Sequence, residues 1–168
     1  MEVGREVHEG GCLCGQLRLR TLGQPRWQAV CHCRFCQRVT GSACNAEAAF
    51  AREDVVFSGE VQAFDYRSPD HGRTMTVQFC ARCGVTVGMR FGRFPAVQAV
   101  LAGAYDDPSW VRFDKHIFTR TALPWEAYRE DMDLFDGHSI GGEGTTPVPT
   151  RPAKKTTASG EAEFGETV

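Results

Sequence analysis

Apolar and polar positions alternate along much of the chain between residues 10 and 135, and this alternation predicts a mainly β protein. Side chains two residues apart lie on the same face of an extended strand, so a period of two indicates a strand with one buried face. The predicted strands are short, rich in β-branched or aromatic residues, and separated by Gly, Pro or Asp. They cover residues 16–20, 27–33, 54–57, 62–66, 74–79, 85–91 and 97–101.

Helical patterns are confined to two short segments. Residues 34–40 precede Gly41, and residues 125–129 follow Pro124, so each segment has a boundary residue typical of helices. No segment repeats with a fixed period. The pattern therefore predicts one domain of short strands with one or two short helices.

The composition separates a folded domain from a tail. Hydrophobic residues make up 42% of the chain and charged residues 24%, which is ordinary for a globular protein. Residues 137–168, in contrast, are rich in Gly, Ser, Thr and Pro and hold a single aromatic residue, Phe164. Such a segment buries too little apolar surface to offset its ordering entropy. We therefore predict an N-terminal extension over residues 1–9, a folded domain over residues 10–136 and a disordered tail over residues 137–168.

The charge balance argues against two classes of partner. The chain has 19 basic and 21 acidic residues, a formal net charge of −2, so no overall basic field recruits nucleic acid or an anionic membrane. No apolar run is long enough to span a bilayer. The first ten residues are polar and charged and do not resemble a secretory signal. We expect a cytoplasmic protein in a reducing compartment.

Cysteine is the residue type that points to chemistry. Seven of the eight cysteines fall into three tight clusters, which are Cys12 with Cys14, Cys31 with Cys33 and Cys36, and Cys80 with Cys83. Zinc needs three or four soft ligands that converge on one point, and short C-x-C and C-x-x-C steps supply them locally. Seven thiolates are one too few for two closed four-cysteine sites. One site is then full and structural, and the other keeps an open position for chemistry.

Two other interpretations of the cysteines compete with zinc binding. A disulfide framework fits the even number of cysteines, but it is rare in a reducing compartment. A thioredoxin-like redox pair at Cys33 and Cys36, or at Cys80 and Cys83, requires a strand followed by a helix. Gly84 and the Val-rich strand pattern after Cys83 argue against that context. Zinc binding is therefore the favoured interpretation.

The period of a strand also predicts where these side chains point. Cys31 and Cys33 share a face in an extended segment, and His32 between them points to the opposite face. His32 is therefore better explained as a histidine satisfied by that second face than as a metal ligand. Gly84, directly after the last cysteine, fits a tight turn that needs a positive φ.

Three motifs carry a resemblance to a known family. They are GGCLCG at residues 10–15, CHCRFC at residues 31–36 with Gly41 after it, and FCARCG at residues 79–84. In this order and spacing they resemble the glutathione-dependent formaldehyde-activating enzyme family, to which the centromere protein V domain also belongs. Supporting segments are residues 102–108, 116–117 and 124–125, so the resemblance covers about residues 10–128.

The resemblance implies a fold and a metal assignment. The fold is a β-tent, built of small antiparallel sheets organised around zinc, with up to two zinc ions per chain. The implied ligands of a structural zinc ion are Cys12, Cys14, Cys80 and Cys83. The implied ligands of a catalytic zinc ion are Cys31, Cys33 and Cys36. The first set joins distant parts of the chain, whereas the second set is local and leaves a position open.

The resemblance also implies a reaction. An open zinc ion with three thiolates binds a fourth thiolate, such as that of glutathione, and lowers its pKa. The implied reaction joins glutathione and formaldehyde to S-hydroxymethylglutathione, which is a carbon–sulfur lyase reaction in reverse. The implied partners are a small-molecule thiol and a small aldehyde, with no cofactor beyond zinc.

Further site residues are candidates. Arg34 and Arg38 flank the open site and are candidates for binding the carboxylates of glutathione, although ordinary surface charge explains them equally well. The acid–base candidates are Asp106, Asp107 and His116, for which a structural role in a turn or at a strand edge is favoured.

Cys44 matches none of the three motifs. We expect a small buried residue in a strand. The alternative is that Cys44 closes the second zinc site, which would make that site structural as well.

Three functions from different classes remain at this point. The first is a zinc-dependent carbon–sulfur lyase-type enzyme that acts on a thiol and an aldehyde. The second is a non-catalytic zinc scaffold that binds another macromolecule. The third is a zinc-ribbon nucleic-acid binder, which the net charge disfavours. A rate with glutathione that depends on the aldehyde separates the first from the others.

Overall fold

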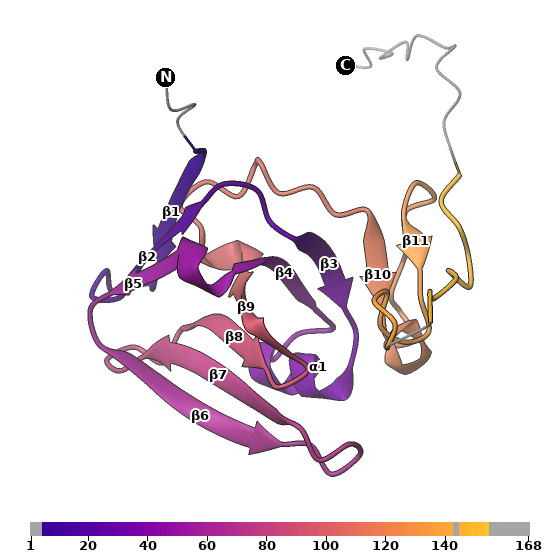
Figure 1. Ribbon diagram of the computed structural model, residues 1–168, viewed down its shortest axis with the longest axis horizontal. Coiled ribbons are helices and arrows are strands. Elements are labelled where there is room, and N and C mark those ends of the chain that lie inside the picture. Colours follow the sequence, from indigo (N-terminus) through magenta and orange to yellow (C-terminus); the bar gives the residue numbers. More distant parts are fainter. Residues whose placement is uncertain (1–4, 143–144, 155–168) are drawn as a thin grey trace, which may run out of the picture.

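Two β-sheets form most of the molecule (Figure 1). The structure is a computed structural model that describes residues 5–142 and 145–154. A three-stranded antiparallel sheet has the order β1-β2-β5, with bounds Val7–Gly11, Arg18–Leu22 and Val55–Ser58. The second sheet has eight strands in the order β11-β10-β3-β4-β9-β8-β7-β6. The prediction of a mainly β fold class is confirmed.

The strands of the large sheet come from most of the chain. In chain order they are β3 (Trp27–Cys31), β4 (Asn45–Ala51), β6 (Val61–Arg67), β7 (Thr74–Cys80), β8 (Thr86–Phe91), β9 (Phe94–Leu101), β10 (Lys115–Ile117) and β11 (Asp133–Leu134). In the part of the sheet with the order β3-β4-β9-β8-β7-β6, all neighbouring strands pair antiparallel. At the other edge, β10 pairs parallel with both β3 and β11.

Helical structure is scarce in the described residues. The one α-helix is α1 (Arg34–Thr40), as predicted, and Gly41 ends it with a φ of 63°. The 3₁₀ turns are η1 (Arg52–Asp54), η2 (Ala102–Ala104) and η3 (Thr119–Thr121). The helix predicted over residues 125–129 does not form. That prediction is wrong because the segment has no apolar face to bury: Trp125 is 72% exposed, and a short helix needs such packing.

The central strands are buried on both faces. On one face, Leu19 of β2 and Leu17 just before it pack against Phe50, Val87 and Val100 of the large sheet. On the other face, a second cluster brings together Ala29, Met89 and Ile117 with Cys31 and Cys36. The large sheet therefore separates a packed core from the side on which three cysteines gather.

Part of the predicted tail lies against the domain, in contrast to the expectation of disorder from residue 137 onward. Arg151 pairs with Leu134 of β11, the Lys154 N–H donates to the Glu130 carbonyl, and Arg93 donates to the Ile140 carbonyl. These contacts use backbone groups, so a composition poor in apolar residues does not reveal them. The prediction for residues 155–168 lies outside the described residues.

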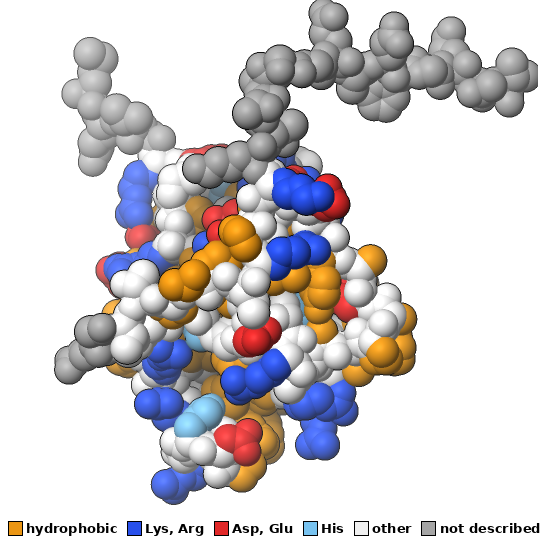
Figure 2. Space-filling view, turned by 90° about the vertical axis from the view of Figure 1, so that its right-hand side faces the viewer, with side chains coloured by type: hydrophobic (Ala, Val, Ile, Leu, Met, Phe, Trp, Pro, Cys, Tyr) orange, Lys and Arg blue, Asp and Glu red, His pale blue; other side chains and the backbone are white. Residues whose placement is uncertain are grey.

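The surface agrees with a nearly balanced charge. On the face shown in Figure 2, Lys and Arg side chains are spread among acidic, apolar and uncharged ones. Within residues 5–142 and 145–154, no helix has the length and apolar character needed to cross a membrane.

Candidate functional site

Four cysteines meet where two strand connections approach each other. Cys12 and Cys14 follow β1, Cys80 is the last residue of β7, and Cys83 lies in the connection from β7 to β8. Their sulfur atoms all lie within 4.8 Å of one another, with Cys12–Cys14 and Cys14–Cys80 separations of 3.4 and 3.7 Å. Tetrahedral zinc with bonds of about 2.3 Å holds its sulfur ligands about 3.8 Å apart, so this donor set fits zinc.

The backbone around this cluster has the form of two tight turns. Gly15 and Gly84 have φ values of 75° and 72°, a conformation that favours glycine, and each follows a cysteine directly. The Leu17 N–H donates to the Cys12 sulfur at 3.3 Å. Burial opposes ionisation of Cys12, but this hydrogen bond and the neighbouring thiols lower its pKa to about 6. These contacts favour the thiolate at Cys12, which is the form that binds metal, whereas the neighbouring thiols help to raise the pKa of Cys14 to about 11.

A second cluster lies where β3 leads into α1. Cys31 is the last residue of β3, Cys33 is the N-cap of α1, and Cys36 lies in the first turn of the helix. Their sulfur atoms lie within 4.8 Å of one another, and the Cys36 N–H donates to the Cys33 sulfur at 3.4 Å. Hydrogen bonds from the Cys31 and Cys36 thiols lower the pKa of Cys33 to about 3. Three soft donors with one preformed thiolate fit a zinc ion with an open position.

The strand-to-helix context bears on the redox alternative. Cys33 and Cys36 do stand where a strand leads to a helix, the context that a thioredoxin-like pair requires. Cys31 nevertheless adds a third sulfur within the same 4.8 Å, and all eight cysteines are free in the structure. The cluster therefore has the composition of a metal site rather than of a two-cysteine redox site.

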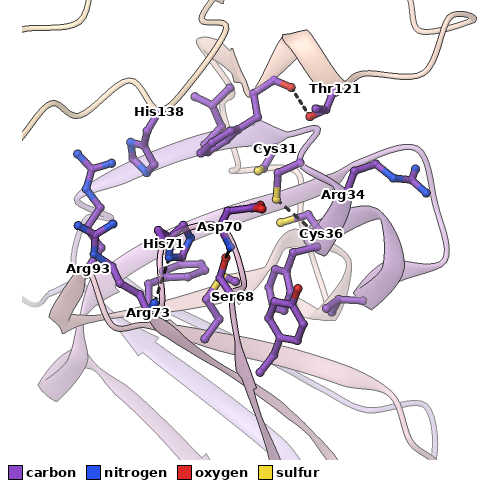
Figure 3. Close-up of a pocket in the computed structure, with 18 of the residues that line it drawn as sticks. Cys31, Arg34, Cys36, Ser68, Asp70, His71, Arg73, Arg93, Thr121 and His138 are labelled. Carbon is purple, nitrogen blue, oxygen red and sulfur yellow. Dashed lines mark hydrogen bonds between the residues drawn. The ribbon is translucent and has the colours of Figure 1, made fainter.

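The three-cysteine cluster lines a cavity with a volume of about 770 Å³, and Figure 3 shows Cys31 and Cys36 on its wall. The cavity is bounded by α1, by β6 and β7, by the connection from β8 to β9, and by residues after β10. In the view of Figure 3, Cys31 and Cys36 lie close together, and Arg73, Arg93 and His138 lie on the opposite side of the cavity. None of the cysteines of the four-cysteine cluster lines this cavity.

Basic side chains surround the cavity. Arg34 and Arg38, predicted from their place beside the cysteines, both line it. Arg34 donates to Gln37 one turn further along α1. Three further arginines line the cavity and were missed by the sequence analysis: Arg73, Arg93 and Arg120. They come from three different connections, and their sequence positions carry no signal that they converge.

A buried carboxyl also lies on the cavity wall. Glu47 of β4 is only 3% exposed and accepts hydrogen bonds from Asn45 Nδ2 at 2.8 Å and Trp27 Nε1 at 3.4 Å. Burial raises the pKa of this carboxyl to about 7. Sequence reasoning missed Glu47, although a lone carboxylate in the apolar run NAEAAFA is unusual enough to mark a functional residue.

The acid–base candidates from the sequence lie away from this cavity. Asp106 forms an ion pair with Arg18 of β2, and the carboxylate of Asp107 accepts the Ser109 N–H at 2.8 Å. His116 is buried and contacts His32, with 2.8 Å between its Nδ1 and the His32 Nε2. The structural roles that the sequence favoured for these three residues agree with these contacts, because none of them lines the cavity.

His32 lies as the sequence predicts, whereas the prediction that Cys44 is a buried residue in a strand is wrong. His32 is buried and does not line the cavity that Cys31 and Cys33 line, so it points to another side of the segment. Burial lowers its pKa. Cys44 is half-buried just before β4 and lines a separate, smaller pocket, and its sulfur is not part of the three-cysteine cluster.

Comparison with known proteins agrees with the site. No functionally curated protein matches the chain in sequence. A crystal structure of a Rhodobacter sphaeroides protein, a structural genomics target, is similar with a TM-score of 0.45 and 16% identity. That similarity covers 62% of this chain and 90% of the other. Residues 7–121 match the sequence model of the glutathione-dependent formaldehyde-activating enzymes. The chain therefore belongs to the glutathione-dependent formaldehyde-activating enzyme family.

Proposed function

We propose that this protein is a zinc-dependent carbon–sulfur lyase-type enzyme that joins glutathione, or a similar thiol, to a small aldehyde such as formaldehyde. The observation that carries this proposal is the three-cysteine cluster that lines a cavity together with five arginines. In this proposal Cys31, Cys33 and Cys36 hold the catalytic zinc ion. Cys12, Cys14, Cys80 and Cys83 hold a structural one, because their cluster joins distant parts of the chain and none of the four lines this cavity.

Zinc, when bound by three cysteines, would supply positive charge that lowers the pKa of a substrate thiol. The arginines around the cavity orient the substrate, because guanidinium groups bind carboxylates with fixed geometry and glutathione has two of them. Arg34 and Arg38 lie on the helix that carries Cys36, and Arg73 and Arg93 lie across the cavity (Figure 3). This separation suits a thiol whose two carboxylates lie at opposite ends of the molecule.

Proton transfer is the task of Glu47 in this proposal. The thiol loses a proton before its sulfur attacks, and the aldehyde oxygen gains one when the carbon–sulfur bond has formed. A carboxyl with a pKa of about 7 accepts and returns a proton near neutral pH. Trp27 and Asn45 fix its two oxygens, so the carboxyl keeps one orientation through the cycle.

The test compares formaldehyde consumption in the presence of glutathione with and without protein. We expect a rate above that of the uncatalysed mixture, falling at low pH as the thiol becomes protonated. Cys36→Ser should abolish this rate, whereas Cys44→Ser, which lies outside the cluster, should retain it. In a cobalt-substituted protein, added glutathione should change the thiolate-to-metal absorption band, because a further sulfur joins the metal.

The non-catalytic scaffold is the outcome if these measurements fail. A cobalt spectrum that does not respond to glutathione, together with no rate above background, would rule out the enzyme proposal. The cavity lined with charged groups and with a buried carboxyl speaks for the enzyme, since a scaffold has no need of either.

A further inference from the structure

The cavity has an apolar wall for which glutathione and formaldehyde offer no counterpart. The wall is formed by side chains of β6 to β9, which are Phe64, Tyr66, Met75, Val77, Phe91 and Phe94. Glutathione consists mostly of carboxylates, an amine and amides, and formaldehyde has no apolar group. A wall of this kind is typical of sites that bind an apolar part of a ligand.

We propose that the aldehyde substrate carries an apolar substituent, an alkyl chain or an aromatic ring, that lies against this wall. The inference rests on the proposed function and narrows its aldehyde. The product is a hemithioacetal in which the carbon bonded to sulfur also bears the substituent.

Size is the first argument for a larger aldehyde. The cavity volume of about 770 Å³ lies in the upper part of the range of ~300–1,000 Å³ found for ligand sites. Formaldehyde adds only one carbon and one oxygen to the thiol, so the wall would face water when that product is bound. Apolar surface left against water forgoes the free energy that its burial would give.

The position of the wall relative to the cysteines is the second argument. Phe35 lies between Cys33 and Cys36 on α1, and its ring stacks on Tyr66 of β6 with centroids 5.2 Å apart. The wall therefore begins beside the three sulfur atoms. A substituent on the carbon that joins the substrate sulfur starts at this point and extends over aromatic surface.

Exposure is the third argument. Phe64 is 58% exposed, and Phe64 and Tyr66, two residues apart on β6, share a face that borders the cavity. The strands β6 to β9 supply the apolar part of the lining, and α1 and the connections supply the charged part. The two parts adjoin each other, because the Arg93 guanidinium lies 5.1 Å from the centroid of the Phe94 ring. That division matches a product with a charged thiol half and an apolar aldehyde half.

The chemistry needs no further reactant. The thiol sulfur forms a bond to the aldehyde carbon, and the electron pair of the C=O π bond moves to oxygen. That oxygen takes up the proton that the thiol gives up. No electrons are gained or lost overall, so no oxidant or reductant is required.

The test measures binding of stable thioether analogues of the product by calorimetry on the zinc-loaded protein. S-hexylglutathione should bind about 10- to 100-fold more tightly than S-methylglutathione. Each fully buried methylene contributes about a four-fold gain, so this range corresponds to burial of about two or three of the roughly five additional methylenes. Phe64→Ser should reduce this preference at least about three-fold while leaving binding of the methyl compound unchanged. Val56→Ser is the matched control, since Val56 is 51% exposed but lies on β5, away from the cavity.

Two results would overturn the inference. Equal affinity for the two analogues would show that the wall receives no substituent. A preference for the hexyl compound that persists in both Phe64→Ser and Tyr66→Ser would show that the hexyl group binds somewhere other than this wall. Turnover of formaldehyde in either case would leave the proposed function standing, whereas failure of that function would appear as no turnover of any aldehyde.

Discussion

In the lining of the cavity, a carboxyl and three thiols occupy one small volume, and their proton affinities depend on one another. The negative charge of the Cys33 thiolate contributes to the raised pKa of Glu47. The negative charge of an ionised Glu47 contributes in turn to the raised pKa of Cys31. Glu47 is nevertheless affected mainly by burial. Its protonation is therefore a property of the folded chain, and this leads to a prediction.

Glu47→Gln should change the pH dependence of stability. Burial raises the pKa of folded Glu47 to about 7, whereas the carboxyl in an unfolded chain has a pKa of 4.5. Between these values the folded state binds more protons than the unfolded state, so the wild type loses stability as pH rises, by up to about 3 kcal/mol. The glutamine variant lacks this loss, so its free energy of unfolding relative to wild type should be higher at pH 8 than at pH 5.

The same variant should lose activity, because glutamine cannot accept a proton. We expect the rate with glutathione and aldehyde to fall about 100-fold or more, the usual contribution of a general acid–base group. Asp106→Asn is the control, since Asp106 pairs with Arg18 away from the cavity and should leave the rate unchanged. Wild-type activity in Glu47→Gln at every pH would show that the proton moves through another group.

At the scale of elements, the sequence predicts the strands that carry their own turns. Before Cys80 the sequence alternates between apolar and polar residues, and the C-x-x-C step from Cys80 to Cys83 is followed by a glycine that marks a turn. The strands β7 and β8 form on either side of this turn. β4 was not predicted because it is Ala-rich and buried on nearly every position, so it shows no alternation. β10 and β11 were missed because they have only three and two residues and take their partners from distant parts of the chain.

The site divides in the same way. The cysteine clusters can be recognised in the sequence because their cysteines stand only two or three residues apart within each motif. The convergence of Arg73, Arg93 and Arg120 is not, since it depends on how three connections meet around the sheet. Glu47 belongs to a strand that carries no pattern of its own, so its burial beside the thiols follows only from the pairing of β3 with β4.

The two clusters should differ in their effect on folding. Cys80→Ser removes a thiol from the cluster that links the connection after β1 to the end of β7, and the metal ion proposed there would contribute directly to the free energy of folding. We expect a loss of roughly 3 kcal/mol, or roughly 10 °C in Tm for a chain of this length. Cys36→Ser should cost less, because its cluster is confined to β3 and α1.

Thermal melts and zinc counts on both variants check this prediction. Wild-type protein should hold up to two zinc ions, and Cys36→Ser should keep the tightly held one after mild chelation. A Cys36→Ser variant that melts far below wild type, beside a benign Cys80→Ser, would reverse the assignment of the two clusters.

At the scale of the whole molecule, the cavity is built from segments far apart in sequence. α1, the β6–β7 hairpin and the segment after β11 each contribute to its lining. The last of these lies beyond residue 136, where composition predicts the domain to end. His138 lines the cavity and its ring lies near those of Trp27, Phe94 and Phe118, with centroids 5.2 to 6.2 Å away. The C-terminal segment therefore takes part in the architecture of the site.

Truncation tests this conclusion. Ending the chain after Asp136 removes the aromatic contacts of His138, the Arg93 bond to the Ile140 carbonyl at 2.6 Å and the pairing of Arg151 with Leu134. Each of these contacts contributes roughly 0.5–1.5 kcal/mol, so together they should lower the free energy of unfolding by roughly 2–4 kcal/mol. The truncated protein should also bind glutathione more weakly, because one side of the cavity opens to water.

The matched control ends the chain after Lys154, which keeps the Lys154 N–H bond to Glu130 and all the contacts above. That variant should have the Tm and the glutathione affinity of the full chain. Melting curves and calorimetric titrations of the three proteins, with zinc content measured in each, separate the two segments. If ending at Asp136 leaves Tm and affinity at the values of the full chain, the contacts of residues 137–154 contribute nothing to stability. The domain would then end where the composition alone places its boundary.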